Sequence, residues 1–194
     1  MSTPEEEFYT EERWANWLDR LREEDIDPED EDSARLLLNL QDDVAIAVAK
    51  IVTAHDEEAL DDEAALEELA DIRAVVLADP DIADDEAAML VDGVQTSLMV
   101  VFGAAEQYIE EGVADETDVD GYLHAAADAE AEEDFDRALG LVACAGTRLI
   151  GHDDAALDVA IAEELEYWLV TEWINGLDSL QEALADPEVV EDEE

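Results

Sequence analysis

The stretch from residue 84 to residue 112, DDEAAMLVDGVQTSLMVVFGAAEQYIEEG, constrains the fold more than any other part of the chain. Apolar residues recur there at three- and four-residue spacing, which predicts a helix, and they occupy nearly every side of its middle. Such a helix has no water-facing side, so other helices must cover it. Asp84 or Asp85 is expected to cap its start and Gly112 to end it. The sequence therefore predicts an all-α, irregular bundle around a long apolar central helix at 84–112.

Details of this central helix raise further expectations. Gly93 and Gly103 lack side chains, so a neighbouring helix is expected to approach closely there, and Met99 is expected to extend the buried surface. The polar residues Gln95–Ser97 lie in the apolar middle. They either line a ligand pocket or hydrogen-bond to neighbouring helices, and the second is the commoner fate of buried polar groups. The uncharged run is only Gly93–Ala105, whereas a membrane span needs about 20 residues, so we expect no membrane span.

The charge of the chain is extreme. It has 59 acidic residues against eight lysines and arginines, and its formal net charge is −51. Self-repulsion of this size destabilises a fold in dilute buffer, but the screening length falls to about 3 Å near 1 M salt. The acids are spread along the chain and lysine is almost absent, a pattern typical of the cytoplasm of salt-accumulating halophiles. We expect a cytoplasmic protein that requires monovalent salt for stability.

Composition also excludes several classes of protein. Hydrophobic residues make up 48% of the chain and only four residues are proline, which argues against disorder. Direct binding of nucleic acid needs a basic stripe, and the arginines nearest to one another, Arg13, Arg20 and Arg22, are outnumbered by adjacent acids. The single cysteine, Cys144, excludes an internal disulfide and is interpreted as a core thiol. The acidic start of the chain is unlike a signal peptide.

Six further helices complete a bundle of about seven, in one helical domain over 1–194. Thr10 is expected to cap a helix at 10–24 and Ser33 to cap a helix at 33–54. The remaining predicted helices are 61–78, 119–131, 134–150 and a last long one that is capped by Asp153 or Asp154 and ends near residue 185. Residues 1–8 and 187–194 are expected to be frayed acidic termini.

Metal and phosphate motifs do not match. Di-iron bundles need Glu-x-x-His on two helices, and none of His55, His124 and His152 has a glutamate three residues before it. No Gly-rich phosphate loop and no His-Glu-x-x-His motif is present. Asp42 and Asp43 are adjacent acids that either hold a metal or act as general bases, or mark the solvent edge of their helix; we favour the solvent edge. We therefore assign no catalytic, cofactor-binding or metal-binding residues, and no cofactor.

Two fragments of enzyme motifs remain as alternatives. All-α nucleotide pyrophosphatases hold magnesium with Glu-Glu-x-x-Glu sets, to which Glu67-Glu68-x-x-Asp71 and Glu163-Glu164-x-Glu166 are the nearest fragments. Neither set is complete, and such fragments arise by chance in so acidic a chain. Arg148-x-x-x-His152 resembles the paired residues of some helical ribonucleases but is one residue short. An enzyme is therefore the less favoured interpretation.

The leading functional hypothesis is a non-enzymatic protein–protein interaction module, an adaptor or homo-oligomer. Four tryptophans and several helices that are apolar on more than one face supply excess apolar surface, which a symmetric dimer could bury. The candidate contact residues are Trp14, Trp17, Trp168 and Trp173; the alternative is that each is simply a core residue. The other hypotheses are a magnesium-dependent nucleotide hydrolase and an acidic regulator of a basic or nucleic-acid-binding partner.

Four segments of the chain have distinctive amino-acid sequences: FYTEERWANWLDRL, LLLNLQDDVAIAVAKIV, AMLVDGVQTSLMVVFGAAEQY and LVTEWINGLDSLQ. Together they resemble an uncharacterised archaeal domain-of-unknown-function family that is abundant in haloarchaea. The resemblance covers most of the chain. It implies a cytoplasmic archaeal protein and brings no known activity, so no catalytic role is carried onto these residues.

Overall fold

The structure is a computed structural model that describes residues 8–24, 26–27, 29–165 and 168–185. These residues form eight α helices and no strand, which confirms the all-α class and adds one helix to the expected number. The expected frayed termini lie outside the described residues, except for Phe8, which packs against the hydrophobic core. The helices are α1 (Glu11–Glu23), α2 (Glu31–Asp56), α3 (Asp62–Val76), α4 (Asp85–Glu111), α5 (Val119–Ala131), α6 (Phe135–Gly151), α7 (Ile161–Glu164) and α8 (Trp168–Ala185).

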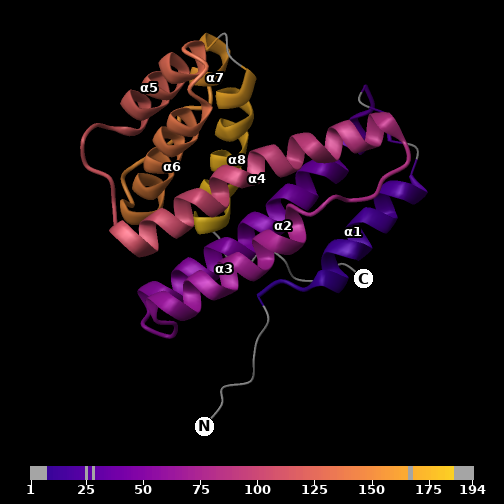
Figure 1. Ribbon diagram of the computed structural model, residues 1–194, viewed down its shortest axis with the longest axis horizontal. Helices are drawn as coiled ribbons and strands as arrows, with labels where there is room; N and C mark the ends of the chain where they lie inside the picture. The colour runs from indigo at the N-terminus through magenta and orange to yellow at the C-terminus, as the bar shows by residue number, and fades with distance from the viewer. Residues whose placement is uncertain (1–7, 25, 28, 166–167, 186–194) are drawn as a thin grey trace.

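Helix α4 is the centre of the fold, as predicted. It contacts α2 and α3 from the N-terminal part of the chain and α6 and α8 from the C-terminal part, and Figure 1 shows it running between these two groups. Its residues Leu98, Val101 and Phe102 are fully buried. One hydrophobic cluster includes residues from all eight helices, so the core is continuous.

The expectation that the middle of α4 has no water-facing side is wrong at one edge. Met99 is 39% exposed, and Asp92, seven residues earlier on the same face, is also exposed. The helices that contact α4 cover the sides carrying Leu98 and Phe102, and they leave this edge at the surface.

By length and composition, α4 also qualifies as a candidate membrane span among the described residues. This is weak evidence, because the core helix of a soluble bundle passes the same test. Half of the qualifying 18-residue window is buried inside the fold. The four helices packed against α4 give it the surroundings of a core helix, and the absence of a membrane span stays a prediction.

Short-range capping signals account for most helix starts. The side chains of Thr10, Asp61 and Asp84 each accept a hydrogen bond from the backbone N–H three residues later, at 3.1, 2.9 and 2.9 Å. Each bond satisfies one of the free amides in the first turn of a helix. Asp118 does the same for α5. Gly112 ends α4 with a φ of 82°, a backbone conformation that glycine adopts without strain.

The predicted cap of the second helix is wrong. Helix α2 begins at Glu31, after Asp30, and no side chain caps it. Ser33 lies inside the helix and is buried, and its hydroxyl accepts a hydrogen bond from the Asp27 N–H at 3.2 Å. Ser33 therefore binds the turn that precedes the helix instead of the helix itself.

The predicted last helix is also wrong in its first half. Residues 152–160 contain two turns and no helix, α7 is a single helical turn, and the described part of α8 starts at Trp168. The free amides of Leu169 and Val170 donate to the two carboxylate oxygens of Glu130 on α5, both at 3.0 Å. A carboxylate at this position also suits the helix dipole, so a side chain from a different helix stabilises the start of α8.

Close helix approach occurs at different glycines from those expected. Nothing lies within 4 Å of a Cβ built on Gly93, and Gly103 makes only an ordinary contact with Ala143. By contrast, a Cβ on Gly146 of α6 would lie 2.4 Å from the Ala104 side chain. A Cβ on Gly176 of α8 would lie 2.0 Å from the backbone oxygen of Ser97. The glycines that permit close packing are therefore Gly146 on α6 and Gly176 on α8, and not the two glycines of α4. Cys144, also on α6, packs against the core as expected.

These contacts predict opposite effects of adding one methyl group at two glycines. Gly176→Ala should destabilise the fold by about 1–3 kcal/mol, because the new Cβ meets backbone that cannot move aside cheaply. Gly140→Ala, at an exposed site in α6 with nothing within 4 Å, should stabilise it by about 0.5–1 kcal/mol. Denaturant unfolding of both variants at one fixed KCl concentration measures the difference. Equal stability of the two variants would contradict the close approach of α8 to α4.

Candidate functional site

The four candidate tryptophans do not form one surface. Trp14 and Trp173 are buried, with 4% and 3% of their surface exposed. Trp17 is half-buried and donates its indole N–H to a side chain of α2. Trp168, at the start of α8, is 62% exposed. Of the four, only Trp168 therefore presents a large apolar surface to a partner.

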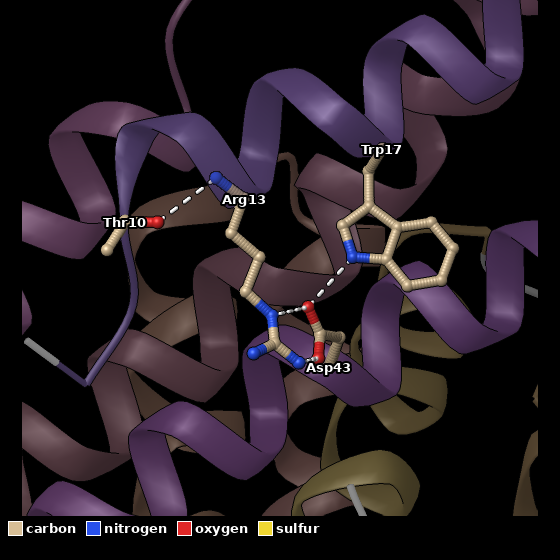
Figure 2. A network of polar contacts seen from close by, with 4 residues as sticks. All are labelled: Thr10, Arg13, Trp17 and Asp43. Carbon is tan, nitrogen blue, oxygen red and sulfur yellow. Dashed lines mark hydrogen bonds and ion pairs between the residues drawn. The ribbon is translucent and has the colours of Figure 1, made fainter. Parts of the chain in front are cut away.

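Asp43 is the centre of a polar network, shown in Figure 2. Arg13 approaches it through two guanidinium nitrogens, with Nε 2.8 Å from Oδ2, and Trp17 Nε1 also donates to Oδ2 at 2.8 Å. Only 4% of the Asp43 side chain is exposed, so the expectation that it marks a solvent edge is wrong. The reason is that α1 packs over this part of α2 and supplies donors that compensate a buried carboxylate. The network holds α1 in place.

The favoured interpretation of Gln95–Ser97, hydrogen bonds to neighbouring helices, fits Gln95 and Ser97 but not Thr96, and Gln95 and Ser97 also line concavities. Gln95 Nε2 donates to the carbonyl oxygens of Val76 and Ala78, at 2.7 and 2.8 Å, at the end of α3. Thr96 and Ser97 donate to carbonyl oxygens one turn earlier in α4. The Ser97 hydroxyl also lies 3.4 Å from a carboxylate oxygen of Glu172 on α8, where both residues line a groove.

The geometry gives the enzyme alternatives little support. Figure 1 shows α3, which carries Glu67 and Asp71, below α4, and α7, which carries Glu163 and Glu164, above α4. Glu166 lies outside the described residues. Within the described ranges, no group of three or more His, Cys, Asp or Glu side chains is close enough to hold a metal ion.

Arg148 and His152 do line one pocket, of about 370 Å³. Arg148 donates to the Ala114 carbonyl oxygen at 2.9 Å. Aspartates outnumber the cations in the lining, so an anionic phosphate ester entering the pocket would meet net negative charge. The aspartates that line it are Asp118, Asp120 and Asp154.

A second concavity is apolar and lies between α2, α4 and α8, with a volume of about 530 Å³. We call it the α2–α4–α8 groove. Leu38 from α2, Met89 from α4 and Trp168 from α8 all line it, and they are 53%, 73% and 62% exposed. Val94 and Gly93 of α4 also contribute to its lining. Three helices therefore bring large apolar side chains together at one opening.

The α8 side of this groove is one face of the helix. Its lining residues include Trp168, Glu172, Asn175, Ser179 and Glu182, at alternating four- and three-residue spacing. Residues at this spacing lie above one another on a helix. The Ser179 hydroxyl accepts a hydrogen bond from Gln41 Nε2 at 2.9 Å, which ties α8 to α2 at the bottom of the groove. The spacing of these residues in the sequence could have identified this face of α8. Nothing in the sequence of α8 itself indicates that no other helix covers the face.

Two carboxyl groups in or beside the groove have altered acidity. Burial raises the pKa of Glu172 above its ordinary value, and the hydrogen bond with Ser97 partly opposes this. Burial also raises the pKa of Asp42, next to the groove; contact with Ser179 opposes this and the charge of Asp178 adds to it. Asp42 Oδ1 is buried without a hydrogen-bond partner. In both side chains, burial disfavours the charged form of the carboxyl group in the folded state.

Removing the Asp43 charge should destabilise the fold. Asp43→Asn breaks the paired contact with Arg13, and because Arg13 is half-exposed we expect a loss of about 1–3 kcal/mol. Asp19→Asn is the matched control, since it removes the same charge from an exposed ion pair with Arg22 and should change stability by no more than about 0.5 kcal/mol. Thermal unfolding of both variants at one salt concentration tests this. Equal losses would show that the network does not hold α1.

Removing the Glu172 charge should stabilise the fold at neutral pH. The raised pKa means that the folded state favours the protonated carboxyl, so its stabilising contribution is present at low pH and is lost as pH rises through the folded-state pKa. Glu172→Gln should therefore raise the unfolding temperature at pH 7, and the gain should vanish below the ordinary pKa of glutamate, about 4.3. Glu67→Gln, at an exposed site on α3, controls for net charge. A pH-independent difference between the two variants would refute the assignment.

Comparison with known proteins places the chain in a family. Residues 7–193 match the model of the family described as "Uncharacterized protein conserved in archaea (DUF2150)". No curated protein and no solved structure matches the chain. The resemblance to an uncharacterised archaeal family, read from the four segments of sequence, is confirmed. Because the match spans nearly the whole chain, this protein belongs to that uncharacterised archaeal family.

Proposed function

We propose that this protein is a helical protein–protein interaction module whose docking surface is the α2–α4–α8 groove. The occupant is a helical segment of another protein, which lays an apolar stripe against the groove. This is a recurring mode of recognition, in which residues of the bound helix at three- and four-residue spacing enter an apolar groove between helices.

One observation carries the proposal. The described residues include six exposed large hydrophobic side chains, and three of them line this single groove. Scattered exposed hydrophobic residues are ordinary on a protein surface, whereas a concentration at one concavity is typical of an interaction site. The six are Leu38, Met89, Met99, Phe135, Val159 and Trp168.

The dimensions of the groove favour a helix as its occupant. The lining residues of α8 run from Trp168 to Glu182, which corresponds to about 21 Å along the helix axis. An α helix of roughly 14 residues has the same length. Tryptophan is among the residues that most often dominate the free energy of binding at interfaces, and Trp168 stands at one end of this face.

The ionic conditions are part of the proposal. With a net charge of −51, the chain attracts cations and basic proteins everywhere on its surface in dilute buffer. We infer that it works in the cytoplasm at molar salt, where this diffuse attraction is screened. Apolar contact in the groove persists under such conditions, so binding measured in molar KCl reports the groove.

Site-specific photo-crosslinking in the source archaeon tests the proposal. A photoreactive benzoylphenylalanine replaces Leu38 or Met89 in the groove, and Phe135 or Val159 elsewhere as matched exposed controls. We expect the two groove positions to capture the same helical segment of one partner and the control positions not to. Trp168→Ala should abolish the adduct. It should weaken binding of that purified segment about 10- to 100-fold in calorimetry.

Three results would overturn the proposal. Equal capture from Phe135 and Val159 would show that any exposed apolar residue suffices. Capture of a second copy of this chain would assign the groove to self-association. No adduct at either groove position would show that no partner occupies the α2–α4–α8 groove.

A further inference from the structure

The charged residues that line the α2–α4–α8 groove all have one sign. They are Glu172, Asp178 and Glu182 of α8, and the described residues that line the groove include no lysine, arginine or histidine. Glu172 is half-buried. Among the described residues, no cationic group lies within ion-pair distance of its carboxylate. A carboxylate in this position gains most from a cation that arrives with the occupant.

Trp168 and Glu172 bring an aromatic ring and a carboxylate, two groups that attract cations, to the same groove. They are one helical turn apart on the face of α8 that lines the groove. An indole ring attracts a cation through its face, and a carboxylate one turn away pairs with the same cation. Apolar side chains of α2 and α4 line the groove opposite them, which keeps part of the site away from water.

The chain fills a comparable arrangement elsewhere with its own arginine. The Arg13 guanidinium pairs with Asp43 and also lies over the ring of Tyr9, 5.8 Å from its centre. Arg20 lies 4.9 Å from the centre of the Trp17 ring. An aromatic ring and a carboxylate thus hold Arg13 between α1 and α2, whereas Arg20 stacks on a ring within α1. Trp168 and Glu172 present the same two kinds of group to the groove.

A second copy of the chain is a poor source of that cation. A two-fold contact through the groove would bring both sets of Glu172, Asp178 and Glu182 close together. The chain has only eight lysines and arginines. Several are already bound within their own chain: Arg13 to Asp43, Arg73 to Glu106 and Arg148 to the Ala114 carbonyl oxygen.

We propose, building on the docking function above, that the groove recognises a cationic amphipathic helix of another protein. Its apolar stripe contacts Leu38 and Met89, and one lysine or arginine lies between the Trp168 indole and the Glu172 carboxylate. The half-buried Glu172 carboxylate has no cationic partner among the described residues. The cation of the bound helix pairs with it, so this contact contributes to affinity and selects the partner.

Selection from a peptide library tests the chemistry directly. The library holds helical peptides of roughly 14 residues with a fixed leucine stripe and random residues at the other positions. The full chain selects from it in about 2 M KCl, where diffuse attraction to its acidic surface is screened. We expect lysine or arginine to be enriched at one position of the helix. Wild-type protein should bind the enriched peptide about tenfold more tightly than its glutamine variant.

Matched variants locate the cation. Glu172→Gln should abolish the enrichment and reduce the tenfold preference to about twofold or less, while binding of the glutamine peptide is unchanged. Trp168→Leu keeps the apolar contact and should reduce the preference as well. Glu67→Gln, on α3, removes an exposed charge away from the groove and should leave the preference intact. Both groove variants are expected to fold, since Trp168 is exposed and Glu172→Gln removes a half-buried charge whose pKa burial raises.

Other outcomes refute the cation assignment. Enrichment of apolar residues alone, or a preference for arginine that survives Glu172→Gln, would show that the helix binds without a cation between Trp168 and Glu172. The proposed docking function would then stand, and the cation assignment would fall. A preference that Glu67→Gln weakens as much as Glu172→Gln does would indicate diffuse charge attraction. No enrichment, with groove-specific crosslinks still observed in cells, would assign the groove to a different partner. Failure of both experiments would refute the docking function as well.

Discussion

The close approach of α8 and α6 to α4 is the constraint on which the rest of the structure depends. Gly176 lies against the backbone at Ser97, and Gly146 lies against Ala104, with no room for a side chain at either glycine. This contact buries the apolar sides of α4 that no water could solvate at acceptable cost. It also fixes the position of α8 relative to α2, so that Trp168 and the residues below it become a wall of the groove. The fold and the candidate site therefore rest on the same contact.

Much of the fold was predictable because its signals are local. The caps at Thr10, Asp61, Asp84 and Asp118 act on amides three residues away, and Gly112 acts on its own φ angle, so short windows of sequence contain the whole interaction. The start of α8 was not predictable in this way, since its amides bind Glu130, some 40 residues earlier. The burial of Asp43 was missed for the same reason: its arginine comes from α1, 30 residues away.

The candidate site was predictable only in part. Helical periodicity marks all four tryptophans as apolar contact residues, and it does not tell which of them another helix covers. One signal could have separated two of them: Trp168 and Trp173 are five residues apart, which places them roughly 140° apart around a helix. They could not both face the core, and the structure buries Trp173. That Leu38 and Met89 stand beside Trp168 depends on how α2 and α4 pack against α8, which only the assembled fold determines.

The carboxylate of Glu130 has a consequence beyond starting a helix. It belongs to the hairpin of α5 and α6, yet its two oxygens hold the first free amides of α8, directly after Trp168. Glu130 therefore ties the α5–α6 hairpin to the turn of α8 that follows Trp168. The hairpin and one wall of the groove are joined through this carboxylate, although they lie far apart in the sequence.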